Sequence, residues 1–198
     1  MMTEPNLMAG EKQFVSAEQL MRDSYELGLR IYESGFRPTF IIGVWRGGAP
    51  VGIAVQEILE MLNCTADHFS VRTSSYDRSG QQADDIKIMG LQHVVDLLQP
   101  QDKLLIVDDI FDSGRSIDAL ITAMTQSCQG LIPKDIRVAT VYYKPKRNKT
   151  PRVPDFYIHE TDAWTVFPHE LLGCSEEEIR ANKLMPKRFY ELLKDSQP

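Results

Sequence analysis

The sequence predicts an α/β fold in which a central, mostly parallel sheet is flanked by helices. Short runs rich in β-branched and aromatic residues alternate with segments of helical periodicity, which indicates a βαβ topology. The apolar run at residues 104–107 has no polar face, as is typical of a strand buried on both sides. The chain has 198 residues, 42% hydrophobic and 25% charged, which suits one globular domain.

The N-terminal half of the chain alternates helices with strands. Residues 1–13 are polar and are expected to fray. Ser16 and Gln19 have the spacing of a capping box, and Gly35 suits the end of the helix that follows. Residues 74–85 have no apolar periodicity and are expected to form a loop or a flexible hairpin. The other expected elements are strands at 39–44, 68–73 and 87–89, and a helix from Pro50 to about residue 62.

The C-terminal half continues the alternation and ends in two helices. The expected elements are strands at 104–107, 136–143 and 156–158, and helices over 117–124, 175–182 and 186–194. Ser175 and Glu178 have the spacing of a second capping box. We expect a single domain over residues 1–198, with a core at about 36–145 and a small hood from the terminal segments, about 14–35 and 146–198.

Composition excludes several classes of function. The net charge of −6 argues against nucleic acid as the main partner. The three cysteines are widely spaced and lack a CxxC pair, so they are expected to be reduced thiols. No run approaches membrane-spanning length, and residues 1–11 lack the pattern of a signal peptide. We therefore expect a soluble cytoplasmic protein without a membrane partner.

The most informative segment follows the apolar run at 104–107. Asp108, Asp109 and Asp112 crowd where a strand, a glycine turn and a helix converge. In open α/β sheets, ligands bind at this edge, and the first turn of a helix suits a phosphate. The carboxylates suit sugar hydroxyls or the water shell of Mg²⁺. Alternatively, one residue caps the helix and the Asp pair is solvated in a turn.

A second polar segment also lies between a strand and a helix. Arg46 is followed by Gly47 and Gly48, which lets backbone N–H groups and a guanidinium converge on an anion. The alternative is a plain glycine turn between two elements.

The segment at 104–116 resembles the signature of the phosphoribosyltransferases, enzymes that use 5-phosphoribosyl 1-diphosphate (PRPP). The resemblance implies a Rossmann-like type I phosphoribosyltransferase fold. It implies that Asp108 and Asp109 hold the ribose hydroxyls and help to place Mg²⁺. In the 6-oxopurine branch of the family, Asp112 would face N7 of the base. The residues that would cradle the 5-phosphate are Ser113, Gly114, Arg115 and Ser116.

Two further segments resemble the PRPP site of the same family. Arg46 and Gly47 match the loop that binds pyrophosphate, where the bond before the basic residue can be a non-proline cis peptide, here Trp45–Arg46. The Ser-Ser-Tyr triplet that ends at Tyr76 resembles the mobile active-site loop. Such a lid would keep water from a ribosyl cation. Any polar surface loop has a similar composition.

The base site is implied by residues after two later strands. Lys144 stands where the branch has a lysine that donates to O6, and Trp164 stands where an aromatic ring stacks on the base. Backbone groups around Thr165 would read the Watson–Crick edge, and Glu170 is a further candidate for metal contact. The alternatives are a core tryptophan and a solvated lysine.

The resemblance implies transfer of the phosphoribosyl group from PRPP to N9 of a 6-oxopurine, with Mg²⁺ as cofactor and release of pyrophosphate. The base would be hypoxanthine or guanine, and xanthine stays open. The family's usual assembly implies a homodimer or homotetramer. Two alternatives remain: a phosphoribosyltransferase for another base, or a PRPP-sensing regulator without transferase activity.

Overall fold

The computed structural model describes residues 12–76, 82–128 and 132–195, and of residues 74–76, 82–85 and 87 it describes the backbone alone. The chain forms two compact units. The larger unit contains residues 21–162, and the smaller one combines the N-terminal segment up to residue 20 with the segment that follows residue 162. The stretches 21–35 and 146–162, which sequence analysis assigned to a hood, thus belong to the larger unit.

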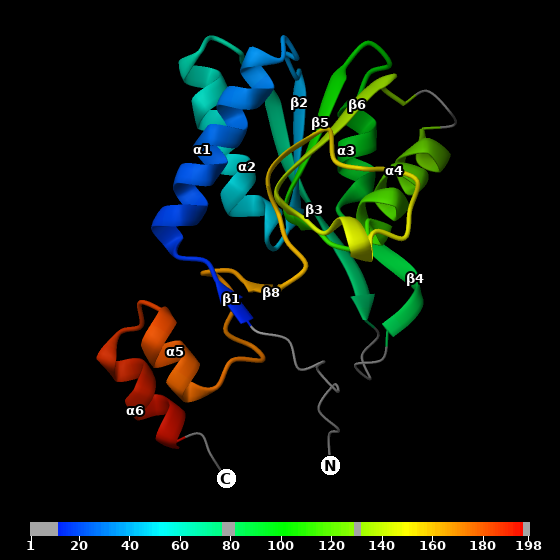
Figure 1. Cartoon of the computed structure of the whole chain (residues 1–198). Helices are drawn as coiled ribbons and strands as arrows, with labels where there is room; N and C mark the ends of the chain where they lie inside the picture. The colour runs from blue at the N-terminus through cyan, green and yellow to red at the C-terminus, as the bar shows by residue number, and fades with distance from the viewer. Residues whose placement is uncertain (1–11, 77–81, 129–131, 196–198) are drawn as a thin grey trace. The chain divides into compact units, whose positions relative to one another are not determined.

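The larger unit is built on a six-stranded sheet with the order β4-β3-β2-β5-β6-β7 (Figure 1). Every neighbouring pair is parallel except β3 and β4, which are antiparallel. This arrangement confirms the predicted α/β class with a mostly parallel sheet. The strands are β2 (Phe40–Trp45), β3 (Asp67–Tyr76), β4 (Gln82–Met89), β5 (Lys103–Phe111), β6 (Asp135–Tyr143) and β7 (Phe156–Glu160).

Helices cover both faces of the sheet. In Figure 1, α1 and α2 lie on one side of the strands, and α3 and α4 lie on the other. The helices are α1 (Ala17–Glu33), α2 (Gly48–Met61), α3 (Leu91–Leu97) and α4 (Arg115–Ser127), and a short 3-10 helix, η1, spans Pro145–Arg147. Because both faces are covered, the central strand β5 is fully buried from Leu104 to Val107, as its run of apolar residues predicts.

Local signals in the sequence set the ends of α1. The Ser16 hydroxyl accepts a hydrogen bond from the Gln19 N–H at 3.0 Å, as the predicted cap requires. Gly35 follows the last turn with a φ of +82°, a left-handed conformation that glycine adopts without a steric penalty. On β7, the imidazole of His159 contacts the carboxylate of Asp23 at 2.8 Å, which ties the helix to the sheet.

The structure corrects several predicted boundaries. β5 continues to Phe111, four residues beyond the apolar run. Of the two options for the polar segment at 74–85, the hairpin is confirmed, because β3 and β4 pair as antiparallel strands and 87–89 belongs to the returning strand. The strands extend further into the segment than predicted, and residues 77–81 lie outside the described part. Helix α3 was missed, and residues 12–14, expected to fray, form a strand.

The smaller unit joins the two ends of the chain. Strand β1 (Lys12–Phe14) pairs in parallel with β8 (Trp164–Val166), and two helices follow, α5 (Glu176–Asn182) and α6 (Lys187–Asp195). The capping box predicted at Ser175 is present: its hydroxyl accepts from the Glu178 N–H, and the Glu178 carboxylate accepts from the Ser175 N–H. Among the described residues, no helix has the length and apolar character to span a membrane.

Candidate active site

The pairing of β2 with β5 brings two of the predicted site segments together. Gly43 lies opposite Val107 in this parallel pair, so the residues that follow each strand meet at the same edge of the sheet. From β2 the chain continues through Trp45, Arg46 and Gly47 into α2, and from β5 it continues through the acidic residues. The edge therefore combines an arginine, a helix N-terminus and two carboxylates.

Two glycines allow the loop to contact the carboxylates closely. A Cβ atom at Gly47 would lie 2.0 Å from a carboxylate oxygen of Asp109, and one at Gly48 would lie 2.2 Å from the carbonyl oxygen of Val107. The carboxylate of Asp108 accepts hydrogen bonds from the backbone N–H groups of Asp109, at 3.0 Å, and of Gly48. Only glycine fits at these two loop positions, which explains why the sequence has the pair.

Burial and the neighbouring carboxylate of Asp109 raise the pKa of Asp108 well above its ordinary value. Two backbone N–H groups oppose this effect but do not cancel it. Asp109 itself is only 7% exposed. The alternative that both residues are solvated in a turn is therefore wrong, because β5 extends through them and carries Asp109 against Gly47. The two carboxyl groups disfavour each other's charge, and a bound cation would favour the ionised form of both.

The peptide bond between Trp45 and Arg46 is cis, as the resemblance allowed. Trp45 and Arg46 are exposed, so the guanidinium at this edge of the sheet faces solvent.

A second glycine turn opens α4. Gly114 has a φ of +76°, and a Cβ atom there would lie 2.7 Å from the ring of Phe111. Gly114, the N-cap residue of α4, supplies no side-chain hydrogen bond to the first turn, so the N–H groups there have no acceptor from the cap. Such a turn suits a phosphate group. The turn consists of Ser113, Gly114, Arg115 and Ser116, the residues predicted for this role.

Lys144 and Asp112, predicted on separate segments, contact each other. Lys144 is 4% exposed, follows β6 and donates its backbone N–H to the carbonyl of Phe111 at 2.9 Å. Its ammonium lies 3.4 Å from one carboxylate oxygen of Asp112, and the guanidinium of Arg147 lies 2.8 Å from the other. The alternative of a solvated lysine is therefore wrong. A buried cation and a carboxylate stand side by side.

Other predicted residues fall outside this cluster. Tyr76 is the last residue of β3, and its side chain lies outside the described part of the structure. Trp164, Thr165 and Glu170 belong to the smaller unit, so their predicted contacts with the base and the metal stay predictions. There, a carboxylate oxygen of Glu170 accepts from the Phe167 N–H at 2.9 Å.

Sequence reasoning missed three residues around the site. Gly48 donates to Asp108, and Arg147 contacts Asp112. Thr140 lies opposite Asp108 in the register of β5 and β6, is fully buried, and has a hydroxyl without a hydrogen-bond partner among the described groups. The sequence did contain a signal for Gly48, because it is the second of the two glycines that follow Arg46. No signal in the sequence singled out Thr140 or Arg147. The place of Thr140 depends on the register of β5 with β6, and that of Arg147 depends on the 3-10 helix η1.

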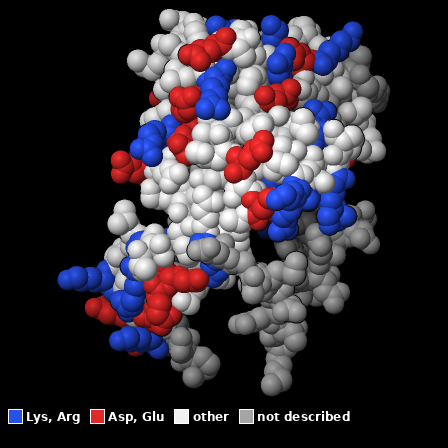
Figure 2. Space-filling view, in the orientation of Figure 1, with Lys and Arg blue, Asp and Glu red and all other residues white. Residues whose placement is uncertain are grey.

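Figure 2 shows basic and acidic side chains interspersed over the face in view. This distribution agrees with the net charge of −6.

Comparisons with known proteins agree with the geometry. The pattern of the phosphoribosyl transferase domain matches residues 11–171. Xanthine-guanine phosphoribosyltransferase from Ruegeria sp. (strain TM1040) is 30% identical over 177 residues, which cover 85% of this chain and 91% of the relative. The enzyme of the same name from Cereibacter sphaeroides is 34% identical over 175 residues, 81% of this chain and 89% of the relative.

A solved structure shows the same fold. Purine phosphoribosyltransferase from Pyrococcus horikoshii is 27% identical and superposes with a TM-score of 0.62, covering 83% of this chain and 97% of that one. These findings confirm the resemblance read from the signature segment, and the chain belongs to the phosphoribosyl transferase family.

Proposed function

We propose that this protein transfers the 5-phosphoribosyl group from PRPP to N9 of a 6-oxopurine, as an enzyme of purine salvage. The observation that carries the proposal is the meeting of three features at one edge of the sheet. These are the carboxylates of Asp108 and Asp109, the start of α2 at Gly47, and the uncapped turn at Gly114. Ribose hydroxyls, a diphosphate and a 5-phosphate are the groups that these three features suit.

The reaction breaks one bond at C1 of the ribose and forms another. The bond from C1 to the diphosphate oxygen breaks, and its electron pair leaves with the diphosphate. Arg46 and the N-terminus of α2 stabilise the negative charge of this leaving group. N9 of the base forms the new bond to C1. The base loses one proton, which Asp112 accepts from N7.

The contact between Lys144 and Asp112 supports the base site. An ammonium held 3.4 Å from the carboxylate of Asp112 can donate to O6 of a purine whose N7 faces that carboxylate. Adenine has a 6-amino group, which offers this ammonium no acceptor. The relatives named above are xanthine-guanine enzymes, and a hypoxanthine-guanine phosphoribosyltransferase from Lactococcus lactis is 28% identical over 159 residues. They support a 6-oxopurine as substrate.

The acidic pair fits Mg²⁺ as a cofactor. Within the described residues, no group of three or more His, Cys, Asp or Glu side chains forms a complete metal cage. Magnesium is commonly held by one or two carboxylates together with substrate phosphates. Asp108 and Asp109 would hold it in this way, and Glu170 is a further candidate. The ion would neutralise charge on the diphosphate.

Pyrophosphate release from PRPP, measured with a panel of bases, tests the proposal. We expect turnover with hypoxanthine and guanine, none with adenine, and loss of activity when EDTA removes Mg²⁺. Preference for adenine or a pyrimidine would contradict the base site. PRPP binding without turnover on any base would favour a regulatory protein. Size-exclusion chromatography with light scattering will test for the expected homodimer or homotetramer.

A further inference from the structure

Strand pairing in the smaller unit places Lys12 directly opposite Trp164. The register of β1 and β8 matches these two residues, and the ammonium of Lys12 lies over the indole ring, 5.3 Å from its centroid. At this distance the cation is attracted to the electron-rich face of the ring. One face of the indole is therefore covered by a side chain from the other end of the chain.

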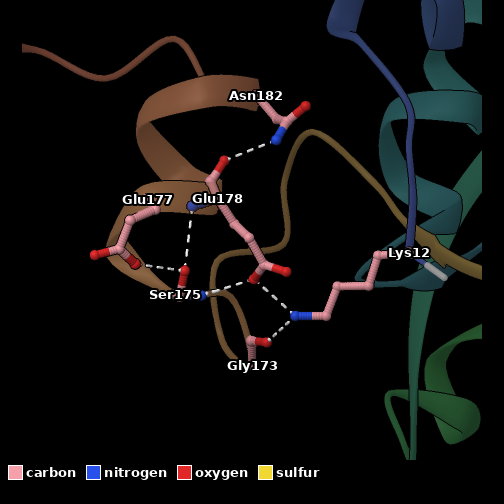
Figure 3. Close-up of polar contacts among 6 residues, drawn as sticks. All are labelled: Lys12, Gly173, Ser175, Glu177, Glu178 and Asn182. Carbon is pink, nitrogen blue, oxygen red and sulfur yellow. Dashed lines mark hydrogen bonds and ion pairs between the residues drawn. The ribbon is translucent and has the colours of Figure 1, made fainter. Parts of the chain in front are cut away.

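The ammonium of Lys12 is fixed by two further contacts, which Figure 3 shows together. It donates to the carbonyl oxygen of Gly173 at 2.8 Å and to a carboxylate oxygen of Glu178 at 2.7 Å. The side chain of Lys12 is only 19% exposed. The ammonium of Lys12 thus makes three contacts at once, with the indole, the Gly173 carbonyl and the Glu178 carboxylate.

The partner carboxylate is itself held in place. The Glu178 oxygen that meets Lys12 also accepts from the Ser175 N–H at 2.8 Å, as part of the capping box of α5. The hydrogen bond from Lys12 lowers the pKa of Glu178, so this carboxylate stays ionised at neutral pH. The charge that anchors Lys12 is therefore permanent under physiological conditions.

The edge of the indole is bounded as well. Gly173 has a φ of +83°, and a Cβ atom there would lie 4.0 Å from Cζ2 of Trp164. The loop before α5 thus lies beside the six-membered ring, and Lys12 contacts the same loop.

We propose that Lys12 is a positioning residue for Trp164, which covers one face of the indole and fixes its plane so that the other face receives a purine ring. The proposal rests on the proposed function, because it takes Trp164 as the ring that stacks on the base. A ring held before the base arrives loses less freedom on binding, which strengthens the complex. Lys12 then acts on the affinity for the base and leaves the affinity for PRPP unchanged.

The experiment compares three variants, Lys12→Met, Lys12→Arg and Lys183→Met. Methionine keeps the aliphatic length of Lys12 and removes its charge, and arginine restores a cation. Lys183 is a matched control, since its ammonium also contacts a backbone carbonyl, that of Phe167, and an aromatic ring, that of Phe14 at 5.6 Å.

Two readouts separate positioning from general stability. The first is KM for guanine and for PRPP. The second is acrylamide quenching of Trp164 fluorescence, measured with Trp45→Phe in every protein so that only one of the two tryptophans remains. For Lys12→Met we expect a three- to tenfold rise in KM for guanine (an order-of-magnitude range), unchanged KM for PRPP and stronger quenching. Lys12→Arg should bring KM for guanine and the quenching most of the way back to their wild-type values. Lys183→Met should change neither KM for guanine nor the quenching.

Two results would overturn the proposal: quenching and KM for guanine that stay unchanged in Lys12→Met, or equal changes in Lys183→Met. Absence of turnover on every base in the wild-type protein would instead defeat the proposed function. The quenching comparison, extended to added guanine without PRPP, would still decide whether Lys12 fixes a base-binding ring.

Discussion

At the scale of single residues, the acidic pair on β5 suits a ligand but lowers the stability of the ligand-free protein. Asp108 is held beside Asp109 at a place where burial already disfavours charge, so its pKa is raised. Two backbone N–H groups hold the carboxylate in position without removing the repulsion. A bound cation would relieve it, and binding would release a proton.

The first prediction concerns Asp108→Asn. A carboxyl group with a higher pKa in the folded chain than in the unfolded chain makes the folded chain bind more protons. The free energy of unfolding therefore falls as the pH rises from about 3.9 through the raised pKa of Asp108. Asparagine does not ionise, so it removes this pH-dependent fall in the free energy of unfolding. Its side-chain oxygen can still accept the hydrogen bond from the Gly48 N–H. At neutral pH we expect Tm to rise by about 2–4 °C, the change that about 1 kcal/mol produces in a chain of this size.

Thermal melts between pH 4 and 8 measure the effect. Glu57→Gln, which removes an exposed carboxylate on α2, should keep the pH dependence of the wild-type protein. With PRPP and Mg²⁺ added, Asp108→Asn, alone or together with Asp109→Asn, should lose the ligand-induced rise in Tm. A variant that is destabilised at neutral pH, or that keeps the full ligand effect, would count against a ligand site here.

The second prediction concerns the coupling of Asp112 with Lys144. We expect Asp112→Asn and Lys144→Met each to reduce kcat/KM for guanine by about ten- to a hundredfold, since each removes a polar partner of the base. Because the two groups lie 3.4 Å apart, the double variant should lose about three- to tenfold less than the product of the single losses. KM for PRPP should change little in all three proteins.

Arg147→Met provides the comparison, because Arg147 meets the same carboxylate from a side chain that is 62% exposed. Solvent screens such a pair, so its coupling with Asp112 should stay below about threefold. Simple multiplication of the effects of Asp112→Asn and Lys144→Met would show that the two residues act independently.

At the scale of elements, the start of α2 links the fold to the site. Gly47 precedes the helix with a φ of −64° and a ψ of −35°, a conformation open to any residue, so only the closeness of Asp109 demands glycine there. The third prediction follows: Gly47→Ala should lower stability by about 1–3 kcal/mol through overpacking and should weaken PRPP binding.

Gly52→Ala is the matched control within α2. A Cβ atom there would lie 3.7 Å from its nearest neighbour, an ordinary contact, and alanine in a helix interior is favoured by about 0.5–1 kcal/mol. Urea unfolding should show a loss in Gly47→Ala and no loss in Gly52→Ala. Equal effects would mean that the contact with Asp109 has no energetic consequence.

Elements with strong local signals were predictable from the sequence, and elements fixed by tertiary contacts were not. The Ser16 hydroxyl caps α1 and the full capping box is present at Ser175, because these contacts act over only four residues. Strand β5 extends through two acidic residues because its pairing with β6 continues to Phe111, and no local propensity reports this. Strand β1 has three residues and exists through its pairing with β8.

At the scale of the whole molecule, the sequence located the segments of the site along the chain but did not predict which of their side chains contact each other. The resemblance supplied Asp112 and Lys144, which lie 32 residues apart in the sequence. The register of β5 with β6 pairs Phe111 with Tyr143 and so brings the two side chains that follow into contact. No pattern in the sequence predicted the contact of Lys12 with Trp164, because it depends on the pairing of β1 with β8, which lie far apart in the chain.

The fourth prediction tests which segments each substrate protects. Amide hydrogen exchange reports protection along the backbone. PRPP with Mg²⁺ should protect the start of α2 and the turn at 113–116, which suit its phosphates. A 9-deaza analogue of guanine, which lacks the reacting nitrogen, should then add protection at Lys144 and at β8, because Trp164 and Thr165 are predicted to contact the base. Protection by the analogue at Lys144 alone would remove β8 from the base site, and protection of β8 by PRPP alone would assign it to the phosphoribosyl group instead.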